Sequence, residues 1–187
     1  MVKEPRPGRV KTRLGRDIGM TDAAWWFRHQ TRRLLRRLSD PRWRIVLAVS
    51  PDREGLQSRV WPGALPRRPQ GRGDLGARMA RILADVPCGP ACLIGADIPD
   101  IRRAHVAAAF GALGDHDAVF GPAHDGGYWL MGLRHPRRQP PGFCRNVRWS
   151  TEHALADTLV TLPDHRIALI DRLRDVDSAD DLPMTRP

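Results

Sequence analysis

The sequence predicts an α/β protein in which helices cover both faces of a central, mostly parallel β-sheet. The first observation is that short apolar runs, of the length of buried strands, alternate along the chain with segments of helical periodicity. The second is the length of 187 residues, which fits a single domain over residues 1–187. Folds of this class bind ligands at the carboxyl ends of their strands, so the residues that follow the apolar runs are the first candidates for a functional site.

The amino-terminal half contains two predicted helices. Residues 3–14 are a basic loop interrupted by Pro and Gly. A helix is predicted over 21–38, where side chains at spacings of four, three and four residues form one inner face: Phe27, Thr31, Leu34 and Leu38. A buried strand over 43–49 and a loop-rich segment over 51–73 precede a second helix, which Asp74 is expected to cap.

The carboxyl-terminal half supplies the remaining strands. They are predicted at 91–96, 117–121, 128–133 and 166–170. One helix is predicted over 102–113 and another after a Ser150 cap. A fold of this type opens with a buried strand, and here Met1 and Val2 alone precede the basic loop. We therefore expect a first strand that is truncated or that begins upstream of residue 1.

Composition indicates a soluble protein of the cytoplasm. Hydrophobic residues make up 41% and charged residues 28% of the chain, and no stretch approaches the ~18 apolar residues of a membrane span. The first residues lack the apolar segment of a secretory signal. The cysteines, at 88, 92 and 144, form no CxxC pair and have no His at zinc spacing, which argues against a disulfide framework or a zinc site.

Charge is unevenly distributed along the chain. The net charge is +10, yet residues 1–81 hold 20 basic and 7 acidic side chains whereas residues 82–187 hold 11 and 14. The basic half suggests an anionic ligand, and the carboxylates of the second half suit a divalent cation. The helix over 21–38 carries an arginine stripe, which we interpret as a solvated face in preference to a nucleic-acid patch: Arg28, Arg32, Arg33, Arg36 and Arg37.

The basic loop has the properties of a phosphate-binding loop. It is not a Walker A motif, because Lys11 and Thr12 lack the glycines that the motif requires before them. Gly8 would still let the backbone approach an anion, and Arg9, Lys11 and Arg13 supply positive charge. The alternative is a merely exposed basic loop.

Carboxylates follow the strand over 91–96. Asp97 and Asp100 lie at the edge where α/β folds bind ligands, and oxygen ligands there suit Mg²⁺ or Mn²⁺, which can bridge a diphosphate. The alternative is that Asp97 only caps the next helix.

Two further acidic segments are candidates. The Asp125-Gly-Gly-Tyr128 segment lies between two apolar strands. Asp125 or His124 could act as a base or bind an acceptor hydroxyl there, although a hairpin turn explains the Asp-Gly pair equally well. The second segment could complete a metal site or form a solvated turn: Asp175, Asp177, Asp180 and Asp181.

Taken together, these segments resemble the DUF2064-type bacterial glycosyltransferase-like proteins, some of which are labelled arsenosugar-biosynthesis or radical-SAM-associated transferases. The matching pieces occur in order over nearly the whole chain: residues 3–14, 73–79, 94–99, 121–128, 149–151 and 175–182. The resemblance implies a Rossmann-like GT-A fold, that of nucleotide-diphospho-sugar transferases. The last piece also looks like the ending of 2-phospho-L-lactate and molybdenum-cofactor guanylyltransferases.

The resemblance implies a role for each matching residue. The nucleotide would be contacted by Arg6, Gly8, Lys11, Arg13, Gly73, Asp74 and Gly76. Asp97 matches the metal-binding aspartate of the fold, although Pro99 replaces the second carboxylate of an Asp-x-Asp motif, and Asp175 and Asp177 are the other metal candidates. Gly126, Gly127 and Tyr128 would lie on the acceptor side, with Asp125 and Lys11 catalytic.

The function that this resemblance implies is transfer of a glycosyl group from a nucleoside diphospho-sugar to a small acceptor, assisted by Mg²⁺ or Mn²⁺. Nucleotidyl transfer from GTP or CTP to a small phosphate or phosphonate is the alternative within the same fold. Hypotheses of other classes are a catalytically silent relative and an Arg-rich nucleic-acid-binding module.

Overall fold

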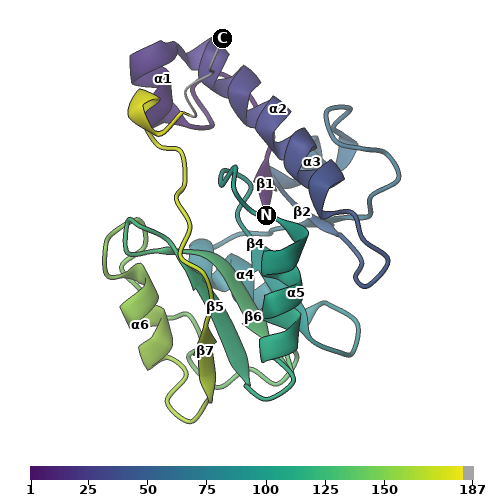
Figure 1. Cartoon of the computed structure of the whole chain (residues 1–187). Helices are drawn as coiled ribbons and strands as arrows, with labels where there is room; N and C mark the ends of the chain where they lie inside the picture. The colour runs from purple at the N-terminus through teal and green to yellow at the C-terminus, as the bar shows by residue number, and fades with distance from the viewer. Residues whose placement is uncertain (183–187) are drawn as a thin grey trace.

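The computed structural model describes residues 1–182, in which helices and strands alternate (Figure 1). The strands are β1 (Val2–Lys3), β2 (Leu47–Ser50), β3 (Arg67–Pro69), β4 (Ala91–Ile94), β5 (Ala118–Pro122), β6 (Tyr128–Leu133) and β7 (Ile167–Leu169). The helices are α1 (Thr12–Ile18), α2 (Met20–Leu38), α3 (Asp52–Gln57), α4 (Leu75–Ala84), α5 (Arg103–Ala112), α6 (Ala154–Val160) and the short 3-10 helix η1 (Ala179–Asp181). The predicted α/β fold is confirmed.

The strands form two hydrogen-bonded sheets. In the order β1-β2-β3 all pairs are parallel, and in the order β4-β6-β5-β7 the strand β6 runs antiparallel to β4 and β5. The reversal of β6 follows from its connection to β5, which is a tight turn over 123–127 and too short for the crossover that parallel strands need. The two sheets meet where the Met1 amino group donates to the Ile94 carbonyl at 2.6 Å.

Helices pack on both faces of the second sheet, as predicted. Leu34 of α2 and Val106 of α5 pack in one cluster with Val119 of β5. Leu83 of α4 packs in another with Phe120, the next residue of the same strand. Successive residues of a strand point to opposite faces, so β5 contributes to both cores. Figure 1 shows α5 in front of this sheet and α4 behind it.

The first strand is as short as predicted. Val2 and Lys3 pair in parallel with Val49 and Ser50 of β2. The buried Gln70 amide fastens this pair by donating to the carbonyls of Val2 and Ala48 at 3.2 and 2.9 Å. The carboxyl end of β1 leads directly into the basic loop.

Several local predictions were wrong. The basic loop ends in helix α1, the segment over 51–73 contains α3 and β3, and the strand predicted over 43–49 is confined to residues 47–50. Helix α6 starts at Ala154 and its N-cap is His153, not Ser150 as predicted. Ser150 has a φ of 62° and belongs to a turn. Among residues 1–182, no helix combines the length and apolarity needed to cross a membrane.

Candidate functional site

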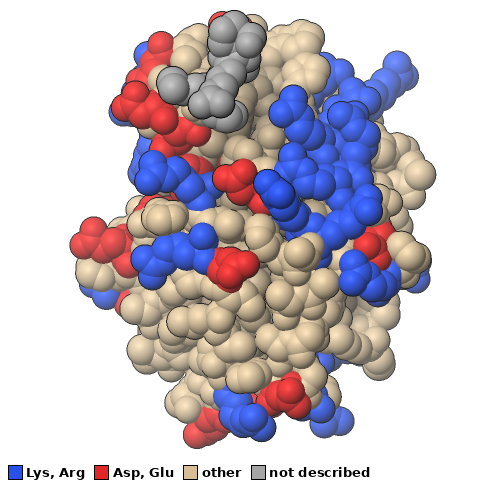
Figure 2. All heavy atoms as spheres, viewed as in Figure 1, with Lys and Arg blue, Asp and Glu red and all other residues tan. Residues whose placement is uncertain are grey.

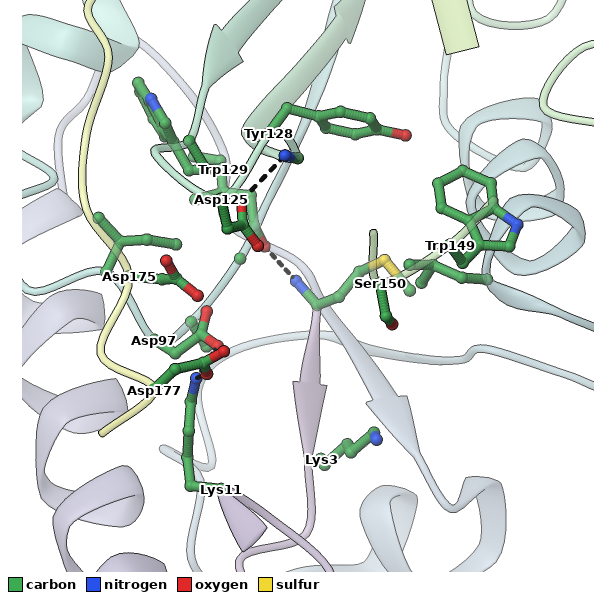
Figure 3. Close-up of a pocket in the computed structure, with 18 of the residues that line it drawn as sticks. Lys3, Lys11, Asp97, Asp125, Tyr128, Trp129, Trp149, Ser150, Asp175 and Asp177 are labelled. Carbon is green, nitrogen blue, oxygen red and sulfur yellow. Dashed lines mark hydrogen bonds and ion pairs between the residues drawn. The ribbon is translucent and has the colours of Figure 1, made fainter. Parts of the chain in front are cut away.

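A cavity of about 590 Å³ lies at the carboxyl ends of β1 and β4 (Figure 3). Its walls come from the basic loop and the start of α1, from residues 93–98, from the turn between β5 and β6, from residues 149–151 and from residues 175–177. This is the edge at which the sequence predicted a ligand site.

Three aspartates bring carboxylate oxygens together in this cavity. Asp97 follows β4, whereas Asp175 and Asp177 belong to the segment that runs from β7 towards α1 (Figure 1). One oxygen from each can be chosen so that all lie within 4.8 Å of one another. The Val176 amide fixes this arrangement by donating to the Asp97 carbonyl at 3.2 Å. The three predicted metal ligands therefore meet, although they are distant in sequence.

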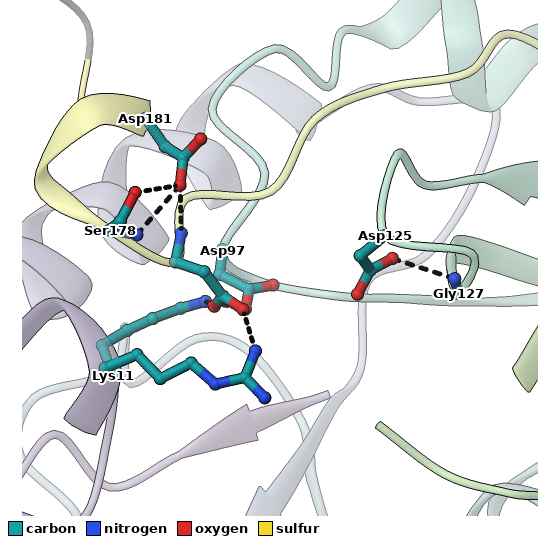
Figure 4. Close-up of polar contacts among 8 residues, drawn as sticks. Lys11, Asp97, Asp125, Gly127, Ser178 and Asp181 are labelled. Atoms are coloured by element: carbon teal, nitrogen blue, oxygen red, sulfur yellow. Dashed lines mark hydrogen bonds and ion pairs between the residues drawn. The ribbon is translucent and has the colours of Figure 1, made fainter. Parts of the chain in front are cut away.

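The side chain of Lys11 ends beside Asp97 (Figure 4) and reaches Asp177 as well (Figure 3). Its Nζ is 2.6 Å from Oδ2 of Asp97 and 2.8 Å from Oδ1 of Asp177, and its side chain is 8% exposed. Arg13 binds the other Asp177 oxygen at 2.9 Å. Burial disfavours the ammonium charge, but the two carboxylates outweigh burial and raise the pKa of Lys11. The same contacts from Lys11 and Arg13 overcome burial and lower the pKa of Asp177.

Asp175 has the opposite electrostatic environment. Burial, followed by the charges of Asp177, Asp125 and Asp97, raises the pKa of its carboxyl group to about 6. Its carboxylate makes no hydrogen bond or ion pair to any residue within 1–182. A partly buried, negatively charged oxygen set with one unpaired member is what a hard divalent cation binds, so the donor atoms fit Mg²⁺ or Mn²⁺.

The turn between β5 and β6 presents Asp125 to the cavity. Oδ1 of Asp125 accepts a hydrogen bond from the Gly127 amide at 2.9 Å, so Asp125 stabilises the hairpin turn. Gly126 has a φ of 82° and packs so closely on the backbone of Glu152 that a side chain would not fit. The turn is thus clamped, and one oxygen of Asp125 is held while the other is free of protein donors among the described residues.

Tyr128 faces the interior of the protein. Its hydroxyl lies 3.4 Å from Oγ1 of Thr158, and its ring meets Phe120 edge to face. Burial raises the pKa of Tyr128 well above its ordinary value. Tyr128 borders the cavity as a neutral, partly apolar wall.

The structure brings together one group of the predicted site residues and leaves another outside the cavity. Lining it are Lys11, Arg13, Asp97, Asp125, Gly127, Tyr128, Asp175 and Asp177. Outside its lining are Arg6, Gly8, Gly73, Asp74, Gly76 and Gly126. Asp74 caps α4, since its Oδ1 accepts from the Ala77 amide at 2.8 Å. Gly76 lies against the Cys144 carbonyl and the Trp149 ring, which leave no room for a side chain.

Sequence reasoning missed the apolar wall of the cavity. It is formed by Leu75, Met79, Leu93, Met131 and Trp149. The periodicity of these residues is that of buried helices and strands, so the sequence alone does not distinguish them from core positions. The one available signal was the Trp-Ser-Thr piece at 149–151, which belonged to the family resemblance.

Arginine side chains gather over α2 and beside it (Figure 2). Arg32, Arg33 and Arg36 are exposed on the face opposite buried Leu34 and Leu38. Arg37, predicted in the same stripe, is instead partly buried and donates to the Ile101 carbonyl at 3.1 Å.

Comparison with known proteins places the chain in a family. Residues 34–151 match the family described as "Uncharacterized protein conserved in bacteria (DUF2064)". A crystal structure from Desulfovibrio desulfuricans G20, of a protein provisionally named a nucleotide-diphospho-sugar transferase, superimposes with a TM-score of 0.80 at 29% identity. The match covers 95% of this chain and 80% of that one. No curated protein matches the chain. The fold is thus that of the nucleotide-diphospho-sugar transferase neighbour, and the chain belongs to the DUF2064 family.

Proposed function

We propose that the protein is a metal-dependent transferase that takes a glycosyl group from a nucleoside diphospho-sugar and passes it to a small-molecule acceptor. The observation that carries this proposal is the meeting of three carboxylates, Lys11 and Arg13 in one cavity at the carboxyl end of β4. Carboxylates suit a divalent cation, and the cationic side chains suit the diphosphate that such a donor releases. The name given to the structural neighbour supports the same donor class.

Each group has a proposed task. Asp97, Asp175 and Asp177 would hold Mg²⁺ or Mn²⁺, which supplies charge neutralisation at a departing diphosphate. Lys11 and Arg13 bind the phosphate oxygens directly. The nucleotide contacts proposed for Arg6, Gly8, Gly73, Asp74 and Gly76 lie beyond the cavity lining and would require the nucleotide to extend towards them.

On the acceptor side, Asp125 is the proposed base. Its Oδ1 is engaged by the Gly127 amide, which orients the carboxylate and leaves Oδ2 to accept the proton of an acceptor hydroxyl. Gly127 lines the cavity and would let an acceptor approach the turn, with Tyr128 beside it, whereas the acceptor contact proposed for Gly126 lies beyond the cavity lining.

Product analysis tests the proposal. The purified protein is incubated with Mn²⁺ and UDP-, GDP- or dTDP-sugars, and release of free nucleoside diphosphate is measured against an Asp97→Asn variant. Release that depends on Mn²⁺ and Asp97 supports glycosyl transfer. Release of pyrophosphate from GTP or CTP, with sugar nucleotides inert, would replace it with nucleotidyl transfer.

A further inference from the structure

The Lys11 ammonium binds two of the three carboxylates that form the candidate cation site. Its Nζ lies 2.6 and 2.8 Å from oxygens of Asp97 and Asp177, two of the three residues whose oxygens form the candidate metal site. Mg²⁺ binds oxygens at about 2.0–2.1 Å. An ammonium and a divalent cation on the same oxygens would repel each other strongly in this partly buried place.

The side chain of Lys11 can leave this position, but its backbone cannot. Lys11 initiates α1 with a φ of 44°, and its carbonyl accepts from the Gly15 amide at 2.8 Å. The neighbouring Val10 is buried, which anchors the turn further. The flexible four-carbon stem of a lysine permits the ammonium to rotate away. Lys11 lines the cavity together with Arg13, so the ammonium can remain there while it changes partners.

We propose that Lys11 keeps the carboxylates closed to cations until a diphosphate enters the cavity and takes over its ammonium. The proposal rests on the proposed function, since the diphosphate is taken to be part of the nucleoside diphospho-sugar donor. The cation and the diphosphate then bind cooperatively. The diphosphate draws the Lys11 ammonium away from the carboxylates, and the cation frees that ammonium to bind the diphosphate. A divalent cation without the donor is then bound weakly.

Manganese binding to the intact protein tests this competition. Free Mn²⁺ is measured by electron paramagnetic resonance during titration of the wild type, Lys11→Met and Lys3→Met. Lys3 also lines the cavity, and no ion pair to a carboxylate is found for it in the described chain, so Lys3→Met controls for the loss of one positive charge. We expect Lys11→Met to bind Mn²⁺ about tenfold more tightly than Lys3→Met.

Inorganic pyrophosphate is the probe for the second ligand. After correction for the manganese–pyrophosphate complex in solution, pyrophosphate should tighten Mn²⁺ binding to the wild type by about 5- to 150-fold, the range of ordinary coupling between ligands. This coupling should fall in Lys11→Met. Equal Mn²⁺ affinities in Lys11→Met and Lys3→Met would overturn the inference alone. Absence of Mn²⁺ binding in every protein, with or without pyrophosphate, would overturn the metal-dependent function as well.

Amine labelling of the wild type gives a readout that needs no variant. The sequence contains two lysines, Lys3 and Lys11, so an acylating reagent and mass spectrometry can follow both side chains directly. Lys11 should react slowly without cation, because its ammonium is paired and buried. Saturating Mn²⁺ should accelerate labelling of Lys11 and leave Lys3 unchanged. Unaltered labelling of Lys11 in protein that has bound Mn²⁺ would refute the displacement.

Discussion

Replacing Asp175 with Asn should stabilise the protein at pH 8 while weakening cation binding. The Asp175 carboxyl group has its pKa raised from an ordinary 3.8 to about 6, mainly by burial and then by its acidic neighbours. Ionised Asp175 is therefore a cost to the folded state, and on the proposed function a bound cation would offset it. Asparagine keeps the shape and removes the charge.

The magnitude follows from the pKa difference. A rise from 3.8 to about 6 corresponds to about 3 kcal/mol, at about 1.4 kcal/mol for each pH unit. Since the carboxylate is partly exposed, screening reduces the expected gain to about 1–2 kcal/mol. The folded state binds the proton more tightly than the unfolded state. The gain from Asp175→Asn is therefore full above pH 6 and fades as the pH falls from about 6 towards 4.

Urea unfolding at pH 8 and pH 4.5, in the presence of a chelator, measures this gain. Asp177→Asn is the matched control: Lys11 and Arg13 lower the pKa of Asp177, so its loss should destabilise at pH 8. Mn²⁺ affinity should fall in both variants. If Asp175→Asn destabilises the protein equally at both pH values, the electrostatic account of the cluster is wrong.

Three further substitutions, one of them a control, test how the loops and helices around the site are held. Gly126→Ala should destabilise by about 2–4 kcal/mol in urea unfolding, because a Cβ would collide with the Glu152 backbone at a positive φ. Gly142 has a similar φ but open space around the position of a Cβ, so Gly142→Ala should lower the free energy of unfolding by only about 1 kcal/mol. Equal losses in the two variants would contradict the packing argument. Asp74→Ala should cost about 1 kcal/mol through loss of the α4 cap to Ala77. If Asp74 also contacts the nucleotide, sugar-nucleotide affinity measured by calorimetry should drop as well, and unchanged affinity would limit Asp74 to capping.

Elements with a strong local signal could be predicted from the sequence. Helix α2 shows a clear inner face, and α4 begins with an Asp74 cap and an apolar stripe. Helix α1 could not be predicted, because it is short and is stabilised by distant contacts. Leu14 is fully buried beside Val176, and the Ala179 amide donates to Asp17. The same limit explains why Ser150 was wrongly predicted to cap α6. The start of this helix is positioned by a distant contact, in which the Leu155 amide donates to the Gly126 carbonyl.

The candidate site was predictable in its parts and not in its connections. Asp97 follows a buried strand, which marks a ligand edge in any α/β fold. The acidic segment over 175–181 is a metal candidate from its carboxylates, with a solvated turn as the alternative, and the resemblance narrows it to Asp175 and Asp177. Spacing along the chain gives no reason for these two residues to meet Asp97. The bridge from Lys11 to Asp177 spans 166 positions. Such a contact depends on how β4 and the segment after β7 are placed, which local patterns do not contain.

Thermal unfolding with UDP-, GDP- and dTDP-sugars, each with and without Mn²⁺, tests the proposed donor class most directly. The account predicts that a sugar nucleotide at 100 times its dissociation constant stabilises the protein by about 2.7 kcal/mol. This shift should require Mn²⁺ and be lost in Asp97→Asn. Stabilisation by GTP or CTP but by no sugar nucleotide would contradict the proposed donor class. A folded protein that no nucleotide stabilises would contradict it as well.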